Sequence, residues 1–252
     1  MRAEDGRSNT EVELSFAVNS ADVFRLVRLL CSASAEWTPT AGRAKRRAPR
    51  TALHFYLQPT DSRDIRRIRV KSRRGSLEIS LESKKVLSQD TFLAKKDERT
   101  DAAGMSLGAV RAIMSEPGSV ISSFIKNQYR VFFGSDVSAF KASLDQVVPI
   151  VPGAEISTAP PVWHFELEEK INWRPDEFFR SRFFRAELAP YLRPLAESKW
   201  ELARMGDPAN VSMPTAKAMG AYLDSLFIQA TRRRPSWHAL SLPSSPGNDL
   251  ER

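Results

Sequence analysis

Two pairs of glutamates stand at a spacing of two residues in this chain. Glu11 and Glu13 flank a valine, and Glu166 and Glu168 flank a leucine. Successive side chains of a β-strand point to opposite faces, so each pair would share one face of a strand. Carboxylates that close together repel each other, and a hard, oxygen-bound cation such as Mg²⁺ or Mn²⁺ relieves that repulsion. The spacing therefore predicts ligands for a divalent metal ion.

Basic side chains follow the same period of two in other stretches. Arg67, Arg69 and Lys71 would share a strand face, and Arg130 would share a face with Lys126. Guanidinium groups make bidentate contacts with phosphate, and lysines add point charge. Basic rows together with glutamate pairs suggest a site that holds metal cations against a polyanion.

A further stretch, 77–84, places Glu82 and Lys84 on one face. Two readings of Glu82 stay open. It is either an additional metal ligand or a partner that orients Lys84. Under either interpretation, we expect Glu82 and Lys84 to lie in the same site as the other charges.

The composition limits the classes of site. The chain has 252 residues, 42% of them hydrophobic, with a single cysteine and three histidines that lack metal-ligand spacing. A disulfide framework and a cysteine zinc site are therefore excluded. The net charge of +8 favours an anionic partner. Much of this excess lies in the basic runs at 43–50 and 232–234, which are either solvated or capture a polyanion such as nucleic acid.

No apolar run reaches the roughly 18 residues that a membrane span needs, and the N-terminus has no apolar signal segment. We therefore expect a cytoplasmic protein without a membrane segment. The sequence predicts no protein partner.

Alternating patterns and turn residues predict an α+β fold with a mostly antiparallel sheet. A loop with at most one short strand, at 91–97, is expected over 85–100. Strands are predicted at about 10–18, 52–58, 65–72, 76–83, 125–134, 136–147 and 162–170. Helices are predicted from Ala21, over 105–115, near 118–124, from Asp176 to about 188, and over 213–230.

The charged strand faces favour a closed barrel over an open sandwich. A sandwich would turn its apolar faces together, whereas a barrel wrapped by helices can turn apolar faces outward and line its channel with charge. About eight strands leave room inside for side chains or one small ligand. We predict one domain over 1–230, a closed antiparallel β-barrel tunnel with helices packed outside, and a disordered tail over 231–252.

In these motifs the chain resembles the triphosphate tunnel metalloenzymes, or CYTH proteins. The resemblance follows the order of the family's motifs over about 10–200. It departs at Ser15, where the family often has a lysine. The matching segments are Glu11-Val12-Glu13, Arg67-Ile68-Arg69-Val70-Lys71, Glu82-Ser83-Lys84, Lys95-Lys96-Asp97-Glu98-Arg99, Tyr129-Arg130, Ser143-Leu144-Asp145, Phe165-Glu166-Leu167-Glu168 and Ser198-Lys199-Trp200. The third of these looks like the motif of the polyphosphate-polymerase (VTC) branch.

The resemblance implies a metal-dependent hydrolase of a triphosphate or short polyphosphate, with Mg²⁺ or Mn²⁺ as cofactor. Inorganic tripolyphosphate, a nucleoside triphosphate and an RNA 5′-triphosphate end all fit as substrate. A VTC-like polyphosphate polymerase and a non-catalytic polyphosphate- or RNA-binding module are the alternatives. Glu11, Glu13, Glu166 and Glu168 would be catalytic metal ligands, with Glu82 as a further candidate. Substrate would be bound by Arg67, Arg69, Lys71, Lys84, Lys96, Arg99, Arg130 and Lys199.

Overall fold

The structure is a computed structural model of the whole chain. It describes residues 10–32, 45–59, 63–73, 75–89, 93–134, 139–153, 160–171, 184–194 and 212–233, with a few single positions between these ranges. Its strands are β1 (Thr10–Val18), β2 (Lys45–Arg46), β3 (Arg50–Leu57), β4 (Asp64–Arg73), β5 (Ser76–Gln89), β6 (Leu93–Ala103), β7 (Val120–Gly134), β8 (Ala139–Pro149), β9 (Val162–Ile171) and β10 (Leu192–Arg193). The α-helices are α1 (Val23–Ser32), α2 (Leu107–Ser115) and α5 (Met219–Arg233).

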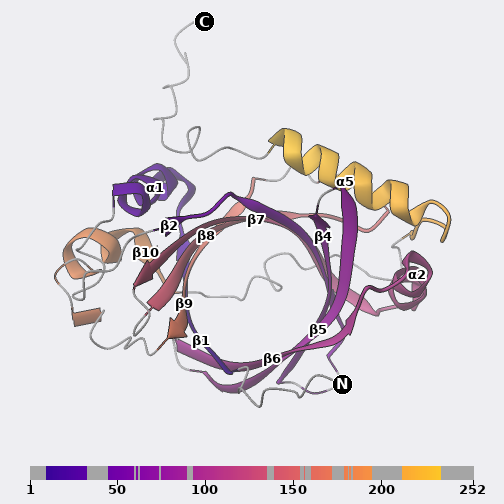
Figure 1. The fold of residues 1–252 in the computed structure, drawn as a ribbon, viewed down its shortest axis with the longest axis horizontal. Coiled ribbons are helices and arrows are strands. Elements are labelled where there is room, and N and C mark those ends of the chain that lie inside the picture. The colour runs from indigo at the N-terminus through magenta and orange to yellow at the C-terminus, as the bar shows by residue number, and fades with distance from the viewer. Residues whose placement is uncertain are drawn as a thin grey trace, which may run out of the picture.

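The strands form a closed antiparallel barrel (Figure 1). Around the ring the order is β1-β6-β5-β4-β3-β7-β8-β9, and the pairing of β9 with β1 closes it. The short strands β10 and β2 lie off the ring, paired with β1 and β7. The predicted tunnel of about eight strands with helices outside is confirmed.

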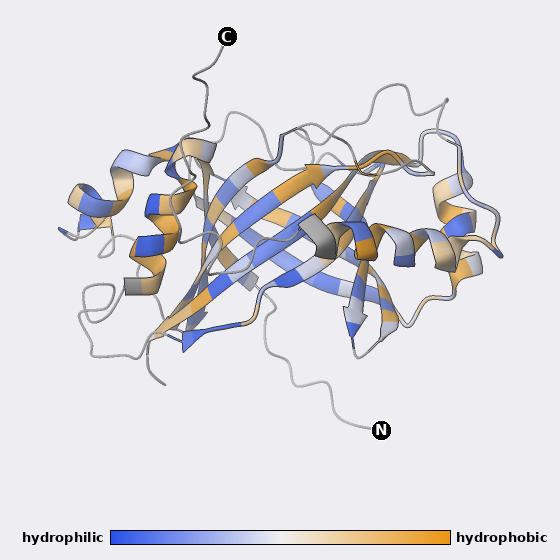
Figure 2. Cartoon of the chain, turned by 90° about the horizontal axis from the view of Figure 1, so that it is seen from above, coloured by the Kyte–Doolittle hydropathy of each residue, from blue (hydrophilic) through white to orange (hydrophobic). Residues whose placement is uncertain are grey.

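Alternation decides which residues face outward. Along most strands every second residue is apolar, as the striped strands of Figure 2 show, and most of these apolar residues are buried. Phe16 and Phe165 pack in one cluster with Leu26 of α1. Leu53 and Ile68 pack in another cluster with the helices α2 and α5. Helices therefore take up the apolar outer face, and the polar residues of the same strands are turned into the barrel.

One end of the barrel interior is apolar instead. Tyr56, Phe124 and Val147 form a third buried cluster, with Ile65 and Val162 packed against it. Register places these residues at the end of β3 and β8 and at the start of β4, β7 and β9, which is a single end of an antiparallel barrel. The ring of Phe124 stacks on His54, with 5.1 Å between ring centroids. This end of the channel is therefore lined by aromatic and aliphatic side chains.

The structure corrects three predictions about elements. Residues 120–124 belong to β7, so the short helix predicted near 118–124 is wrong. The segment expected as a loop over 85–100 is the end of β5 and most of β6. The helix predicted from Ala21 begins as a 3₁₀ turn at Ser20–Asp22 and becomes α-helical only at Val23, and the side-chain oxygen of Asn19 caps the turn by accepting a hydrogen bond from the backbone N–H of Ala21.

Other expectations fall partly or wholly outside the described residues. These are the tail beyond 233, the first part of the basic run at 43–50, most of the helix predicted from Asp176, and the motif that contains Lys199. No described helix combines the length and the hydropathy needed to span a bilayer.

Candidate active-site channel

The two glutamate pairs lie on the neighbouring strands β1 and β9. Their side chains are on the face opposite the apolar cluster of α1, so they point into the barrel. Glu13 is directly opposite Glu168, and Ser15 is directly opposite Glu166. Glu13, Glu166 and Glu168 are each at most 8% exposed. Like charges directly opposite on adjacent strands destabilise a sheet unless a cation lies between them.

Lysines supply the opposite charge in the described structure. Glu11 accepts a hydrogen bond of 2.6 Å from the Nζ of Lys84, and Glu13 lies 3.3 Å from the Nζ of Lys96. On β9, Glu166 lies 3.4 Å from the Nζ of Lys126.

The next glutamate of β9, Glu168, pairs with both Lys141 and Lys170. Every carboxylate of the two pairs therefore has an ammonium group beside it.

A second group of charges spans β4, β5 and β6. The Nε and Nη2 atoms of Arg67 donate to one oxygen of Glu82, at 3.0 and 2.8 Å, and Nη2 also donates to Glu98. Arg69 pairs with the other oxygen of Glu82, which is only 2% exposed. Burial acts to lower the pKa of Arg67, but the neighbouring Tyr56, Glu82 and Glu98 outweigh it, so the pKa is raised. Glu82 thus holds two arginines.

Cations gather at one end of the barrel, which we call the mouth. It is the end opposite the aromatic cluster, at the start of β3, late in β4 and late in β7. Arg50, Lys71 and Arg130 lie here, and no described residue forms an ion pair with them. Burial and the nearby Arg50 and Arg47 lower the pKa of Arg130 to about 10. Burial and the nearby Arg69 lower the pKa of Lys71.

The strand β2 extends this basic character along the outside of the mouth. Lys45 and Arg46 are exposed and pair with Phe132 and Val131 of β7. The backbone N–H of Arg47 donates to the backbone oxygen of Arg130 at 3.0 Å. The described part of the basic run at 43–50 therefore lies next to the mouth.

The structure brings most of the predicted site residues into one channel. These are Glu11, Glu13, Arg67, Arg69, Lys71, Glu82, Lys84, Lys96, Arg130, Glu166 and Glu168. Lys199 lies outside the described residues.

Arg99 is a correction. It is exposed on the outer face and donates to Asp97, because residues 96 and 99 have opposite parity on β6. Parity also shows what the sequence reasoning missed at this strand. Glu98 shares the inner face of Lys96, and it lies 3.2 Å from the Nζ of Lys84. Counting in twos from Lys96 would have found it.

A buried ion pair links β7 and β8. The Nζ of Lys126 is 2.6 Å from an oxygen of Asp145, whose side chain is fully buried. Burial acts to lower the pKa of Lys126, but Asp145 and Glu166 outweigh it and the pKa is raised. Alternation predicted that Lys126 lies on the same face as Arg130, but it did not predict which carboxylate would pair with it.

The carboxylates fit a hard divalent cation by their chemistry and position. Mg²⁺ is commonly bound by one or two carboxylates together with substrate phosphates. Glu13 and Glu168, opposite each other and nearly buried, offer such a donor set. Within the described ranges, no three acidic, histidine or cysteine side chains converge on one point. The carboxylates of Glu13 and Glu168 lie against lysines instead.

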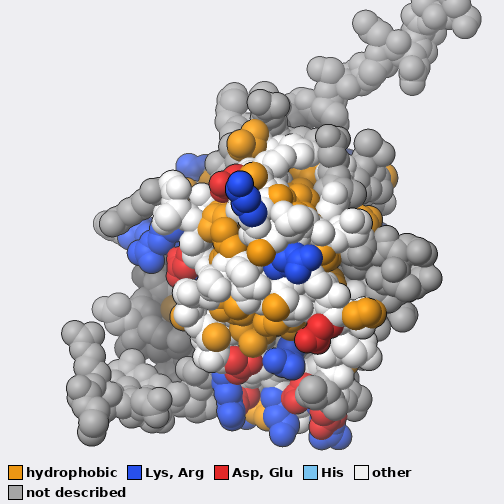
Figure 3. Space-filling model, turned by 90° about the vertical axis from the view of Figure 1, so that its right-hand side faces the viewer, with side chains coloured by type: hydrophobic (Ala, Val, Ile, Leu, Met, Phe, Trp, Pro, Cys, Tyr) orange, Lys and Arg blue, Asp and Glu red, His pale blue; other side chains and the backbone are white. Residues whose placement is uncertain are grey.

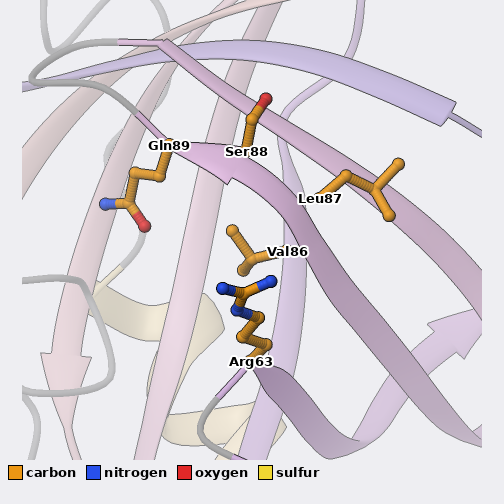
Figure 4. A pocket seen from close by; sticks show the side chains of 5 residues that line it. All are labelled: Arg63, Val86, Leu87, Ser88 and Gln89. Atoms are coloured by element: carbon orange, nitrogen blue, oxygen red, sulfur yellow. The ribbon is translucent and has the colours of Figure 1, made fainter.

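A shallow surface pocket lies at the end of the barrel opposite the mouth (Figure 4). Arg63, Val86, Leu87, Ser88 and Gln89 line it. It contains one cation and no carboxylate, so its chemistry does not match that of the channel.

Comparison with solved structures finds similar folds at low identity. The PH1819 protein from Pyrococcus horikoshii OT3 is 16% identical, with a TM-score of 0.47 over 76% of this chain and 97% of that chain. The Pct1 RNA triphosphatase of S. pombe is 10% identical, with a TM-score of 0.44 over 73% of this chain and 79% of that chain. The Mimivirus capping enzyme triphosphatase is 13% identical, with a TM-score of 0.39 over 68% of this chain and 85% of that chain.

No protein-family model matches the chain, and no curated protein matches it either. At these identities a similarity concerns the course of the backbone and assigns no role to a side chain.

Proposed function

We propose that this chain hydrolyses a triphosphate or short polyphosphate with Mg²⁺ or Mn²⁺ as cofactor. The observation that carries the proposal is the distribution of charge in the channel. Arg50, Lys71 and Arg130 are cations at the mouth for which no described residue is an ion-pair partner, and the buried Glu166 lies two strands from Arg130. Arg130 is opposite Ser143, which is opposite Glu166. The two charged residues are thus two strands apart, about 10 Å at ordinary strand spacing.

The basic side chains would hold the negative oxygens of consecutive phosphates, with charge-assisted hydrogen bonds from the guanidinium groups. A bound divalent cation would neutralise charge on the terminal phosphate. Glu13 and Glu168 would hold it, with Glu11 and Glu166 beside them. Phosphoryl transfer depends mainly on positioning and electrostatic stabilisation, so the channel needs no nucleophilic side chain.

In the proposed reaction, the oxygen of a water molecule forms a bond to the terminal phosphorus while the bridging P–O bond breaks. One proton of the water passes to the carboxylate that orients it or to solvent, and the leaving oxygen departs with the shortened phosphate chain. The contribution of the chain itself is to hold the phosphates in line and to orient the water by a carboxylate.

Several substrates share the group that the channel would bind. Inorganic tripolyphosphate, nucleoside triphosphates and RNA 5′-triphosphate ends all carry a linear triphosphate. The VTC-like resemblance of Glu82-Ser83-Lys84 keeps polyphosphate synthesis as a variant of the proposal. Against a ligand role for Glu82 stands its position between Arg67 and Arg69, so we propose that it orients these arginines.

A second candidate is a polyphosphate-binding module without activity. The ion pairs of Glu13 and Glu168 with lysines favour it, because the carboxylates are already neutralised without a metal. The hydrolase would release phosphate from its substrate, whereas the binding module would not.

The test is phosphate release from a panel of tripolyphosphate, ATP and triphosphate-ended RNA, with Mg²⁺, Mn²⁺ or EDTA. We expect release that needs the metal. Glu168→Gln should reduce turnover by at least a hundredfold, while Glu169→Gln, on the outer face of the same strand, should not. Absence of release from the unaltered protein with every metal would reject the enzyme and favour the binding module.

A further inference from the structure

We propose that Lys126 and Lys141 occupy the carboxylates of the ligand-free channel and transfer to substrate phosphates when a divalent cation takes those carboxylates. Metal and polyphosphate then bind cooperatively. The inference rests on the proposed function and assigns phosphate-binding roles to two lysines outside the predicted site residues.

The first supporting observation is where the two ammonium groups lie. The Nζ of Lys126 is 2.6 Å from Asp145 and 3.4 Å from Glu166, and Lys141 pairs with Glu168. Glu166 and Glu168 are on β9, the strand that closes the ring against Glu13. The lysines thus contact the oxygens that a metal ion would need.

The second observation is how the two kinds of cation are held. Arg67 is fixed by a planar fork on Glu82. A lysine carries a compact charge on a flexible four-carbon stem, so it can change partner by rotation of its side chain. Arg67 is therefore suited to a fixed role, and Lys126 and Lys141 are suited to an exchange of partners.

Electrostatics then links the two ligands. A metal ion that binds alone takes Glu168 from Lys141, and it takes Glu166 from Lys126, which then keeps only Asp145. Loss of a carboxylate beside a nearly buried ammonium group is strongly unfavourable. Phosphates that bind alone meet glutamates of the same sign. When both ligands bind, each lysine gains a phosphate and each carboxylate gains the metal. Such coupling between ligands typically changes an affinity by 5- to 150-fold.

The experiment is Mn²⁺ binding to the full chain, followed by electron paramagnetic resonance of the free ion. It is done with and without an imido analogue of tripolyphosphate that is not hydrolysed, after correction for Mn²⁺ bound to the analogue in solution. We expect the analogue to increase the affinity for Mn²⁺ by about tenfold or more. Equal affinities with and without the analogue would overturn the inference.

Substitution of the lysines tests their part directly. In Lys126→Met or Lys141→Met, Mn²⁺ alone should bind more tightly and the effect of the analogue should shrink. Lys141→Met is the safer variant, since Glu168 keeps Lys170. The control is Lys85→Met with Lys95→Met, both exposed outside the channel. Coupling that persists unchanged in both channel variants would refute the exchange.

Phosphate release from tripolyphosphate separates this inference from the proposed function. Turnover without coupling between Mn²⁺ and the analogue would overturn the inference alone. Absence of both turnover and Mn²⁺ binding would overturn both.

Discussion

Buried ion pairs stabilise the folded protein, whereas cations without a described ion-pair partner in this channel destabilise it. Glu82 is buried between two arginines, so removal of its charge leaves Arg69 without its described partner. We expect Glu82→Gln to lower the free energy of unfolding by about 3–5 kcal/mol, the usual loss when one member of a buried pair is removed. Urea unfolding measures this.

Glu78→Gln is the matched control for that experiment. The side chain of Glu78 is 51% exposed, 4.0 Å from Arg73. An exposed pair of this kind contributes at most about 1 kcal/mol. Equal losses in the two variants would show that Glu82 does not hold the arginines as described.

Arg130 should show a trade between stability and binding. Its pKa is lowered to about 10, which means that its charged form is disfavoured in the folded protein. That cost is fully present at neutral pH and disappears only as the pH rises from about 10 toward the usual arginine value. Arg130→Gln should therefore raise the melting temperature of the ligand-free protein while weakening tripolyphosphate binding by about tenfold or more.

Thermal melting and calorimetric titration measure the two effects. The control is Arg99→Gln, whose side chain is 70% exposed on the outer face. A variant of Arg130 that melts earlier and binds tripolyphosphate normally would contradict the assignment.

At the scale of elements, the helices are what turn the charged faces inward. In α5, Leu223 is fully buried against the barrel and Ile228 is 54% exposed. We expect Leu223→Ala to lower the free energy of unfolding by about 2–5 kcal/mol, the range for large-to-small changes in cores. Ile228→Ala should change it by less than about 0.5 kcal/mol. Similar losses from the two would mean that α5 does not pack as described.

Strand β6 explains what the sequence could not predict. Its outer face has charges as well as its inner face: Arg99 pairs with Asp97, and Ser83 of β5 donates to Asp101. Figure 3 shows both signs of charge at the lower edge of the molecule, where β5 and β6 lie in Figure 1. Without apolar residues on one face, alternation is invisible. The strands that lie under helices alternate clearly and their predicted ranges overlap the observed ones, except that the first residues of β7 were predicted as a helix.

The site was predictable to the same degree as its strands. Glu13, Glu168 and Arg130 lie on strands with a clear apolar face, so parity alone predicted that they face the channel. Glu98 was missed, and Arg99 was wrongly assigned to the site, because the register of β6 was unknown. The partner of each charge also depends on which strands are neighbours around the ring, and no local pattern contains that information.

At the scale of the whole molecule, barrel closure concentrates charges that are far apart in the sequence. Glu13 and Glu168 come from the first and the last strand of the ring and lie opposite each other only because β1 pairs with β9. An open sheet would leave both strands as edges in water. The prediction of a barrel depended on this point, since charged faces on so many strands need one common interior.

The concentration of positive charge at the mouth should affect the rate at which an anion binds. Positive charge at one end of a low-dielectric barrel produces a directed field that draws an anion to that end from a distance. We expect the association rate of fluorescently labelled tripolyphosphate, measured by stopped flow, to fall steeply between 20 and about 200 mM salt. The dissociation rate should change much less.

The exposed cations Lys45, Arg46 and Arg47 should contribute to this field without touching the triphosphate. Their replacement by alanine should slow association several-fold and leave dissociation nearly unchanged. Alanine at Lys85, Lys95 and Lys217 removes the same charge from other faces and should slow association less. Equal slowing by both triple variants would mean that only net charge matters. If the field is directed, the charge at the mouth determines where an anion first meets the molecule, separately from how tightly it is bound, and most encounters begin at the end of the barrel where Arg50, Lys71 and Arg130 lie.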